Sequence, residues 1–132
     1  MKLDHIAIVV RDLEQAASVY SKKLGVPLKS RHRIDAEGVE VAVMELDNAH
    51  IELVKPLDKA SGVASFLEKR GEGLHHICLE VDNIEALIRY LGASGIKLID
   101  DKPRTGYKGN KAVFVHPSST NGVLIEFYEK DM

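Results

Sequence analysis

The stretch Leu3-Asp4-His5-Ile6-Ala7-Ile8-Val9-Val10 near the start of the chain is echoed by Leu74-His75-His76-Ile77-Cys78-Leu79-Glu80-Val81. Both stretches are rich in aliphatic residues, which is typical of a buried β-strand. The segments that close the two halves also correspond, because His50-Ile51-Glu52-Leu53-Val54 matches Leu124-Ile125-Glu126-Phe127-Tyr128. The sequence therefore predicts an internal duplication, in which both halves repeat one pattern of elements.

Each half carries one His on its first predicted strand and one Glu on its last. The spacing between the halves is 76 − 5 = 71 residues for the His pair and 126 − 52 = 74 residues for the Glu pair. Taken singly, each of these residues could be an ordinary polar residue of a half-exposed strand. Because they recur at matching places, we predict that His5, Glu52, His76 and Glu126 bind one divalent metal ion. Imidazole and carboxylate ligands suit Zn²⁺, Co²⁺, Ni²⁺ and Mn²⁺.

Length and composition narrow the class of protein. The chain has 132 residues, of which 45% are hydrophobic, and these values fit one globular domain. The net charge of −2 does not favour a nucleic-acid partner. The apolar runs are too short to cross a bilayer, so no membrane association is expected. Cys78 is the one cysteine, which excludes an internal disulfide and predicts a buried core residue of a cytoplasmic protein.

The spacing of apolar and turn residues predicts a βαβββ pattern in each half. Asp12 is the expected N-cap of the first helix, which Gly25 and Pro27 end. The predicted elements of the first half are a strand at 3–10, a helix at 13–24 and strands at 26–35, 39–44 and 49–55. A short linking helix at 61–70 follows. Those of the second half are a strand at 74–81, a helix at 84–91 and strands at 97–101, 112–116 and 122–129.

We therefore predict a single α+β domain over residues 1–132. Module one covers residues 1–56, the segment with the linker helix covers 57–72, and module two covers 73–132. One βαβββ module leaves one face and one edge of its sheet uncovered. Two tandem modules would form a curved mixed-sheet cup with the helices outside, and the inner face would hold the metal ligands.

The period of two along a strand singles out further residues. His50 shares a face with Glu52, so it either lies near the metal or sits at the rim in solvent. His75 and His76 face opposite sides, and the repeat selects His76 as the inward one. Glu40 would point into the cup if its neighbours Val39 and Val41 pack against the helices. Partial desolvation of such a carboxylate would suit it to act as a general base.

The motifs resemble the vicinal oxygen chelate superfamily and, within it, the methylmalonyl-CoA epimerases. The resemblance spans nearly the whole chain. It is carried by Leu3-Asp4-His5-Ile6-Ala7, Gly73-Leu74-His75-His76-Ile77, Gly109-Asn110-Lys111 with His116-Pro117, and Gly122-Val123-Leu124-Ile125-Glu126.

The resemblance implies metal-ligand positions at His5, His76 and Glu126. Glu52 falls where the family has Gln in some members and Glu in others, and Glu40 falls on the position of the catalytic carboxylate. By the same resemblance Glu126 serves as a second acid–base group. The implied reaction interconverts (R)- and (S)-methylmalonyl-CoA through a metal-chelated enolate. Co²⁺ is the first choice of cofactor, followed by Mn²⁺, Ni²⁺ or Zn²⁺, and a homodimer is expected.

Three alternatives belong to the same fold. A glyoxalase-like lactoylglutathione lyase would use the same ligands, but such relatives carry Asp-Pro-Asp-Gly where this chain has the run from His116 to Gly122. A non-enzymatic ligand-binding protein would not need Glu40 beside a four-ligand metal site. A ring-cleaving dioxygenase normally uses only three protein ligands, two His and one carboxylate. The predicted four-ligand set therefore favours the epimerase.

Overall fold

The computed structural model describes residues 1–105 and 109–130. The chain divides into two compact units, one made of residues 5–75 and the other of residues 1–4 together with 76–132. The first unit contains most of module one and the linker helix, and the second contains most of module two. No helix in the described part of the chain is long and apolar enough to cross a membrane.

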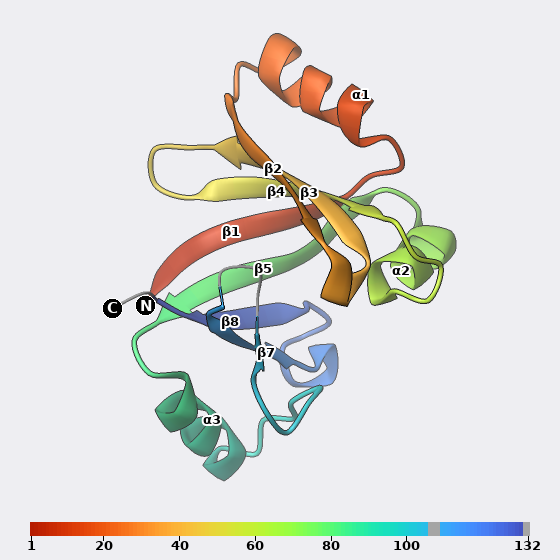
Figure 1. Cartoon of the computed structure of the whole chain (residues 1–132). Coiled ribbons are helices and arrows are strands. Elements are labelled where there is room, and N and C mark those ends of the chain that lie inside the picture. Colours follow the sequence, from red (N-terminus) through yellow and green to blue (C-terminus); the bar gives the residue numbers. More distant parts are fainter. Residues whose placement is uncertain (106–108, 131–132) are drawn as a thin grey trace. The chain divides into compact units, whose positions relative to one another are not determined.

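The unit of residues 5–75 has the predicted βαβββ order (Figure 1). β1 pairs in parallel with β4, and β4 pairs with β3 and β3 with β2 in antiparallel fashion, so this part of the sheet is mixed. The predicted first helix ends early as an α-helix and continues as a π-helical turn, η1. The elements are β1 (Lys2–Val9), α1 (Leu13–Ser18), η1 (Val19–Lys23), β2 (Leu28–Ile34), η2 (Asp35–Glu37), β3 (Val39–Glu45), β4 (His50–Pro56) and α2 (Gly62–Arg70).

Helix α1 begins where the sequence predicts, because the Asp12 side chain accepts a hydrogen bond of 3.0 Å from the Gln15 backbone N–H. Its buried side forms a core cluster with β3 and β4. Gly25, just after η1, has a φ of 76°, a conformation that glycine adopts without strain and that lets the chain turn back toward the sheet. The cluster consists of Val10, Leu13, Ala16, Ala17, Ala42, Met44 and Leu53.

The two faces of this sheet are distinguished by β3. Ala42 and Met44 lie in the cluster with α1, whereas Val41 and Val43 belong to a second cluster on the opposite face. That second cluster also contains Ala7, and Val63 of α2 packs against it. The face that carries Val41 and Val43 is therefore not the face that α1 covers.

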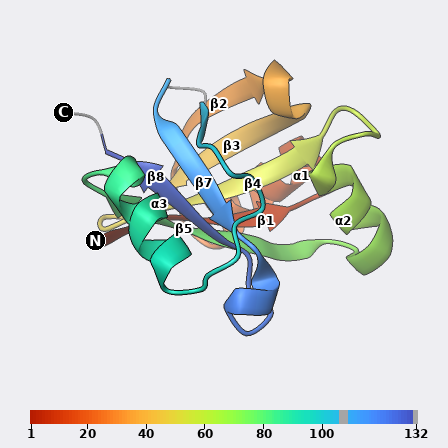
Figure 2. The same ribbon diagram turned by 90° about the horizontal axis from the view of Figure 1, so that it is seen from below.

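The unit that contains residues 76–132 also follows the βαβββ order. β5 pairs in parallel with β8, while β8 with β7 and β7 with β6 pair antiparallel. Helix α3 begins at an N-cap formed by Asn83, which accepts a hydrogen bond of 3.0 Å from the Ala86 N–H. It lies alongside β7 and β8 and packs on Val113, Val115 and Phe127 (Figure 2). The elements are β5 (Gly73–Val81), α3 (Ile84–Ala93), β6 (Arg104–Thr105), β7 (Lys111–Val115), η3 (Pro117–Ser119) and β8 (Ile125–Glu129).

Two predicted strands of module two are wrong in their bounds. Residues 97–101 run beside β7 with hydrogen bonds from the Ile99 N–H and from the His116 N–H, but they form only an isolated bridge between Leu98 and Val115. Lys102 and Pro103 follow this segment, and β6 begins directly after the proline. The last strand begins at Ile125 rather than at 122, because η3 and a turn at Gly122, with φ 87°, occupy the preceding residues.

Candidate metal centre

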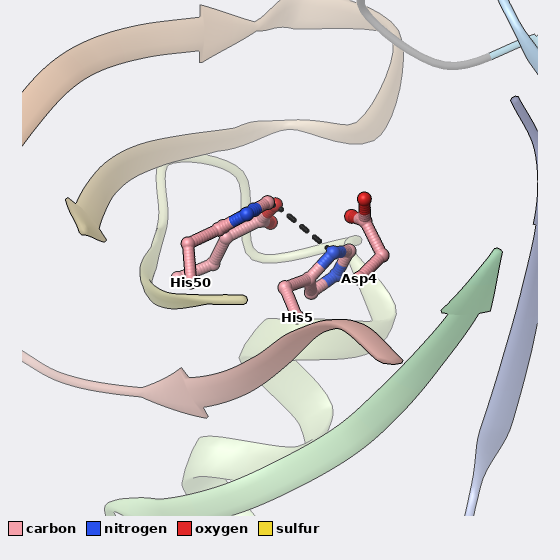
Figure 3. Close-up of side chains that lie close together, drawn as sticks. Asp4, His5 and His50 are labelled. Carbon is pink, nitrogen blue, oxygen red and sulfur yellow. Dashed lines mark hydrogen bonds and ion pairs between the residues drawn. The ribbon is translucent and has the colours of Figure 1, made fainter. Parts of the chain in front are cut away.

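Module one brings three potential ligands to one face of its sheet. In the register of β1 and β4, His5 lies beside His50, and Ala7 lies beside Glu52. Residues that pair in this way share a face, so His5, His50 and Glu52 project to the same side. The Glu52 Oε2 atom lies 3.3 Å from His5 Nδ1 and 2.9 Å from His50 Nε2. The two imidazole rings stack with centroids 5.1 Å apart (Figure 3).

These three side chains are largely withdrawn from solvent. The side chains of His5, Glu52 and His50 are 9%, 14% and 25% exposed, respectively. A carboxylate this buried needs charge-bearing or hydrogen-bonding partners, and the two imidazoles supply them. One ligand atom from each residue lies within 4.8 Å of the others. Bonds of about 2.1 Å to one ion allow separations of up to about 4.2 Å, so a small inward movement would bring all three onto a metal.

Module two repeats the arrangement with a single pair. His76 Nε2 lies 3.0 Å from Glu126 Oε1, and the two side chains are 10% and 16% exposed. In the strand registers, Cys78 and Phe114 each lie beside Glu126, so they share its face. The ring of Phe114 meets the His76 ring edge-on, with centroids 5.4 Å apart. The pair therefore lies among residues of the neighbouring strands, on a face that is largely shielded from solvent.

The choice between the adjacent histidines His75 and His76 is confirmed. His75 points the other way and makes an edge contact with Phe66 of α2, with ring centroids 4.9 Å apart. His76 shares its side with Glu126. The sequence also left open whether His50 lies near the predicted ligands or at the rim, and its contacts with His5 and Glu52 place it beside them.

The orientation predicted for Glu40 is wrong. The expectation required Val39, Val41 and Val43 to pack against the helices, whereas it is Ala42 and Met44 that pack against α1. Val43 is the register partner of Glu52 and therefore lies on the ligand face. Glu40 alternates with those valines, so its side chain projects to the opposite face of the sheet.

The contacts of Glu40 agree with that placement. Its Oε2 atom lies 3.5 Å from the Arg31 guanidinium, and Arg31 also pairs with Glu14 on α1. The hydrogen bond that Arg31 donates to Glu14, together with the charges of Glu14 and Glu40, raises the pKa of Arg31 above its usual range. Arg31 thus joins α1, β2 and β3 through two carboxylates. The general-base role of Glu40 stays a prediction that this position does not support.

Reasoning from the sequence did not assign the other side chains of module two to the ligand face. Cys78 is fully buried, as predicted, and it lies beside Glu126. Tyr128, two residues after Glu126, accepts a hydrogen bond of 3.2 Å from the Asn110 side chain. The period of two from His76 and Glu126 was the available signal, because it puts Cys78 and Tyr128 on their face.

Comparison with known proteins agrees with the fold and the paired sites. Residues 4–114 match the model of the Glyoxalase/Bleomycin resistance protein/Dioxygenase superfamily. The chain therefore belongs to this superfamily, and the predicted fold class, two tandem βαβββ modules with a mixed sheet, is confirmed.

Individual relatives narrow the class. The mitochondrial methylmalonyl-CoA epimerase of Homo sapiens is 39% identical over 126 residues, which cover 95% of this chain and 72% of the human one. A crystal structure of methylmalonyl-CoA epimerase from Mycobacterium tuberculosis matches with a TM-score of 0.93 and 34% identity, covering 99% of this chain and 89% of that one.

A solved complex of a methylmalonyl-CoA epimerase with methylmalonyl-CoA and NH₄⁺ matches with a TM-score of 0.91 and 27% identity, covering 98% of this chain and 94% of that one. Within the superfamily the chain belongs to the methylmalonyl-CoA epimerase family, and it is an isomerase of the epimerase class.

Proposed function

We propose that this protein interconverts (R)- and (S)-methylmalonyl-CoA with the help of one divalent metal ion. The observation that carries the proposal is the repeated, buried His–Glu pair, His5 with Glu52 and His76 with Glu126. The names of the relatives and the solved complex with methylmalonyl-CoA support the substrate. A glyoxalase-type substrate has no comparable support.

The donor set fits the metal that the family implies. His5, Glu52, His76 and Glu126 would hold it, with two neutral imidazoles and two carboxylates as ligands. When bound, a divalent ion acts as a Lewis acid toward the oxygens of the substrate. Co²⁺ remains the first choice, with Mn²⁺, Ni²⁺ and Zn²⁺ as the other candidates. Two carboxylates balance the charge of a divalent ion, which favours a tightly held one.

The acidity of the substrate explains what the protein must do. The reacting carbon lies between a thioester and a carboxylate, so removing its proton gives an enolate, and returning the proton to the other face inverts the centre. Glu126 is the proposed acid–base group on the ligand face, where its carboxylate is 16% exposed and bonded to His76. Glu40 is not assigned the other proton transfer, because it lies on the opposite face of its sheet.

Two further predictions stay proposals. The homodimer rests on the resemblance and on the edge strands that each half of the sheet leaves, β2 in module one and β6 in module two. The cytoplasmic location rests on the single cysteine in a buried strand. Light scattering that gives a monomer mass at micromolar concentration would contradict the homodimer.

The function is tested by following deuterium incorporation at the reacting carbon of methylmalonyl-CoA in deuterated water. The metal-loaded protein should catalyse rapid exchange, and removal of the metal by a chelator should abolish it reversibly. Exchange at an equal rate in metal-free protein would contradict the metal-assisted reaction. Absence of exchange in metal-loaded protein would contradict the epimerase itself.

A further inference from the structure

His50 breaks the symmetry of the duplication. The closing segments align His50 with Leu124 and Glu52 with Glu126, so module two has an aliphatic residue where module one has an imidazole. A histidine at this place is therefore not required by the repeat. His50 lies directly beside His5 in the register of β1 and β4. Any role of this histidine must therefore be specific to module one.

The side chain of His50 contacts two of the proposed metal ligands, Glu52 and His5. Its Nε2 atom lies 2.9 Å from the Glu52 oxygen that also faces His5 Nδ1 at 3.3 Å. Its ring stacks on the His5 ring at 26° between planes. Two imidazole nitrogens thus converge on one carboxylate oxygen, on a face that is largely withdrawn from solvent.

We propose that His5, His50 and Glu52 form a cation site of their own, which binds a divalent transition-metal ion without a ligand from module two. Two imidazoles and one carboxylate on one side of an ion leave its remaining positions open, and such sets bind first-row divalent ions. The inference deepens the proposed metal-assisted function, since it makes module one the part that retains the ion when His76 and Glu126 are absent. It also assigns His50 as a ligand in that site.

The competing explanation is that His50 only donates a hydrogen bond to Glu52 and never reaches the metal. An outer hydrogen-bond partner of this kind typically changes metal affinity by about 10- to 100-fold. Affinity alone does not separate the two explanations. The number of imidazoles attached to the ion does separate them, because a hydrogen-bonding His50 leaves one coordinated imidazole in a protein that lacks His76.

The test uses the full-length chain with both ligands of module two replaced, His76→Ala with Glu126→Gln. Titration of this variant with Co²⁺, followed by visible absorption, should give one equivalent bound, more weakly than in the wild type. Adding His50→Ala should weaken that binding by at least about tenfold. His32→Ala is the matched control, because His32 is a partly buried histidine of β2 that bonds to Ser30. The control should leave binding unchanged.

Proton NMR of the Co²⁺-loaded variant supplies the second readout. Two strongly shifted imidazole N–H signals should be seen, from His5 and His50, and His50→Ala should remove one of them. A single signal before that substitution would overturn the ligand role. Loss of all Co²⁺ binding in the variant, while the wild type binds, would overturn the separate site but leave the proposed function intact. A wild type that binds no metal would overturn both. If the double variant does not fold, His76→Ala alone is titrated in the same way.

Discussion

The two modules share a plan but differ in what surrounds the shared His–Glu pair. In module one, Glu52 is bonded to His50 as well as to His5. In module two, Glu126 is bonded to His76, and its strand neighbours are Cys78 and Phe114. The duplication has kept the first-strand His and the last-strand Glu and changed the residues beside them. We infer that both halves need the pair, whereas the residues beside it differ between the modules.

The largest expected effect comes from His76→Ala. The purified variant should lose its tightly bound metal, and deuterium exchange should fall by about 10²- to 10⁴-fold, since the ion no longer assists proton removal. Metal analysis of the purified protein and the exchange assay measure the two losses.

His75→Ala is the control for that variant, because His75 is the next residue and packs on Phe66 on the other side of the strand. It should keep both the metal and the exchange rate. A His76→Ala protein with a full equivalent of tightly bound metal would remove His76 from the ligand set.

Replacing the N-cap residues of the two helices should have a smaller effect, and one that is similar in the two modules. Asp12 and Asn83 occupy equivalent places in the two modules, and each accepts a hydrogen bond of 3.0 Å at the start of a helix. Replacing either by Ala should lower the free energy of unfolding by about 1 kcal/mol. Denaturant titration of both variants measures it. A change above about 2 kcal/mol in one variant alone would show that the modules depend unequally on their helices.

The smallest effect is expected for Glu40→Gln. The carboxylate is partly exposed on the α1 side and pairs with Arg31 at 3.5 Å. Losing one such surface pair should lower the free energy of unfolding by less than about 1 kcal/mol. Exchange activity should stay close to that of the wild type, because Glu40 does not share a face with Glu52.

Glu37→Gln is the control for Glu40→Gln, since Glu37 lies in the short turn η2 just before β3. It removes one negative charge from the same neighbourhood. If Glu40→Gln lost most of its exchange activity with metal still bound, while Glu37→Gln did not, the general-base role predicted from the sequence would be restored.

Much of the fold was predictable because the duplicated sequence contains each element twice, so that each copy supports the prediction of the other. The N-cap at Asp12, the βαβββ order and the inward choice of His76 all follow from local pattern and from the repeat. The strand predicted at 97–101 is wrong, because the apolar residues there lie along β7 without forming a continuous ladder of hydrogen bonds. Local pattern cannot distinguish a paired strand from an extended segment beside one.

The error at Glu40 has a different cause. Along β3 every residue from Val39 to Met44 except Glu40 is buried, so the pattern of apolar residues does not tell the two faces apart. Only the packing of α1 on Ala42 and Met44, and the register of Val43 with Glu52, assign the faces. Both are contacts between different elements of the fold, and a single strand does not encode them.

The central proposal is that the two His–Glu pairs bind one ion between them and that this ion assists proton exchange. Metal content per chain, measured together with deuterium exchange, tests it most directly in the wild type, His5→Ala and His76→Ala. We predict one tightly bound ion per wild-type chain, and loss of that tight binding and of exchange in either variant. Two ions per wild-type chain, with each variant keeping one, would contradict a shared site.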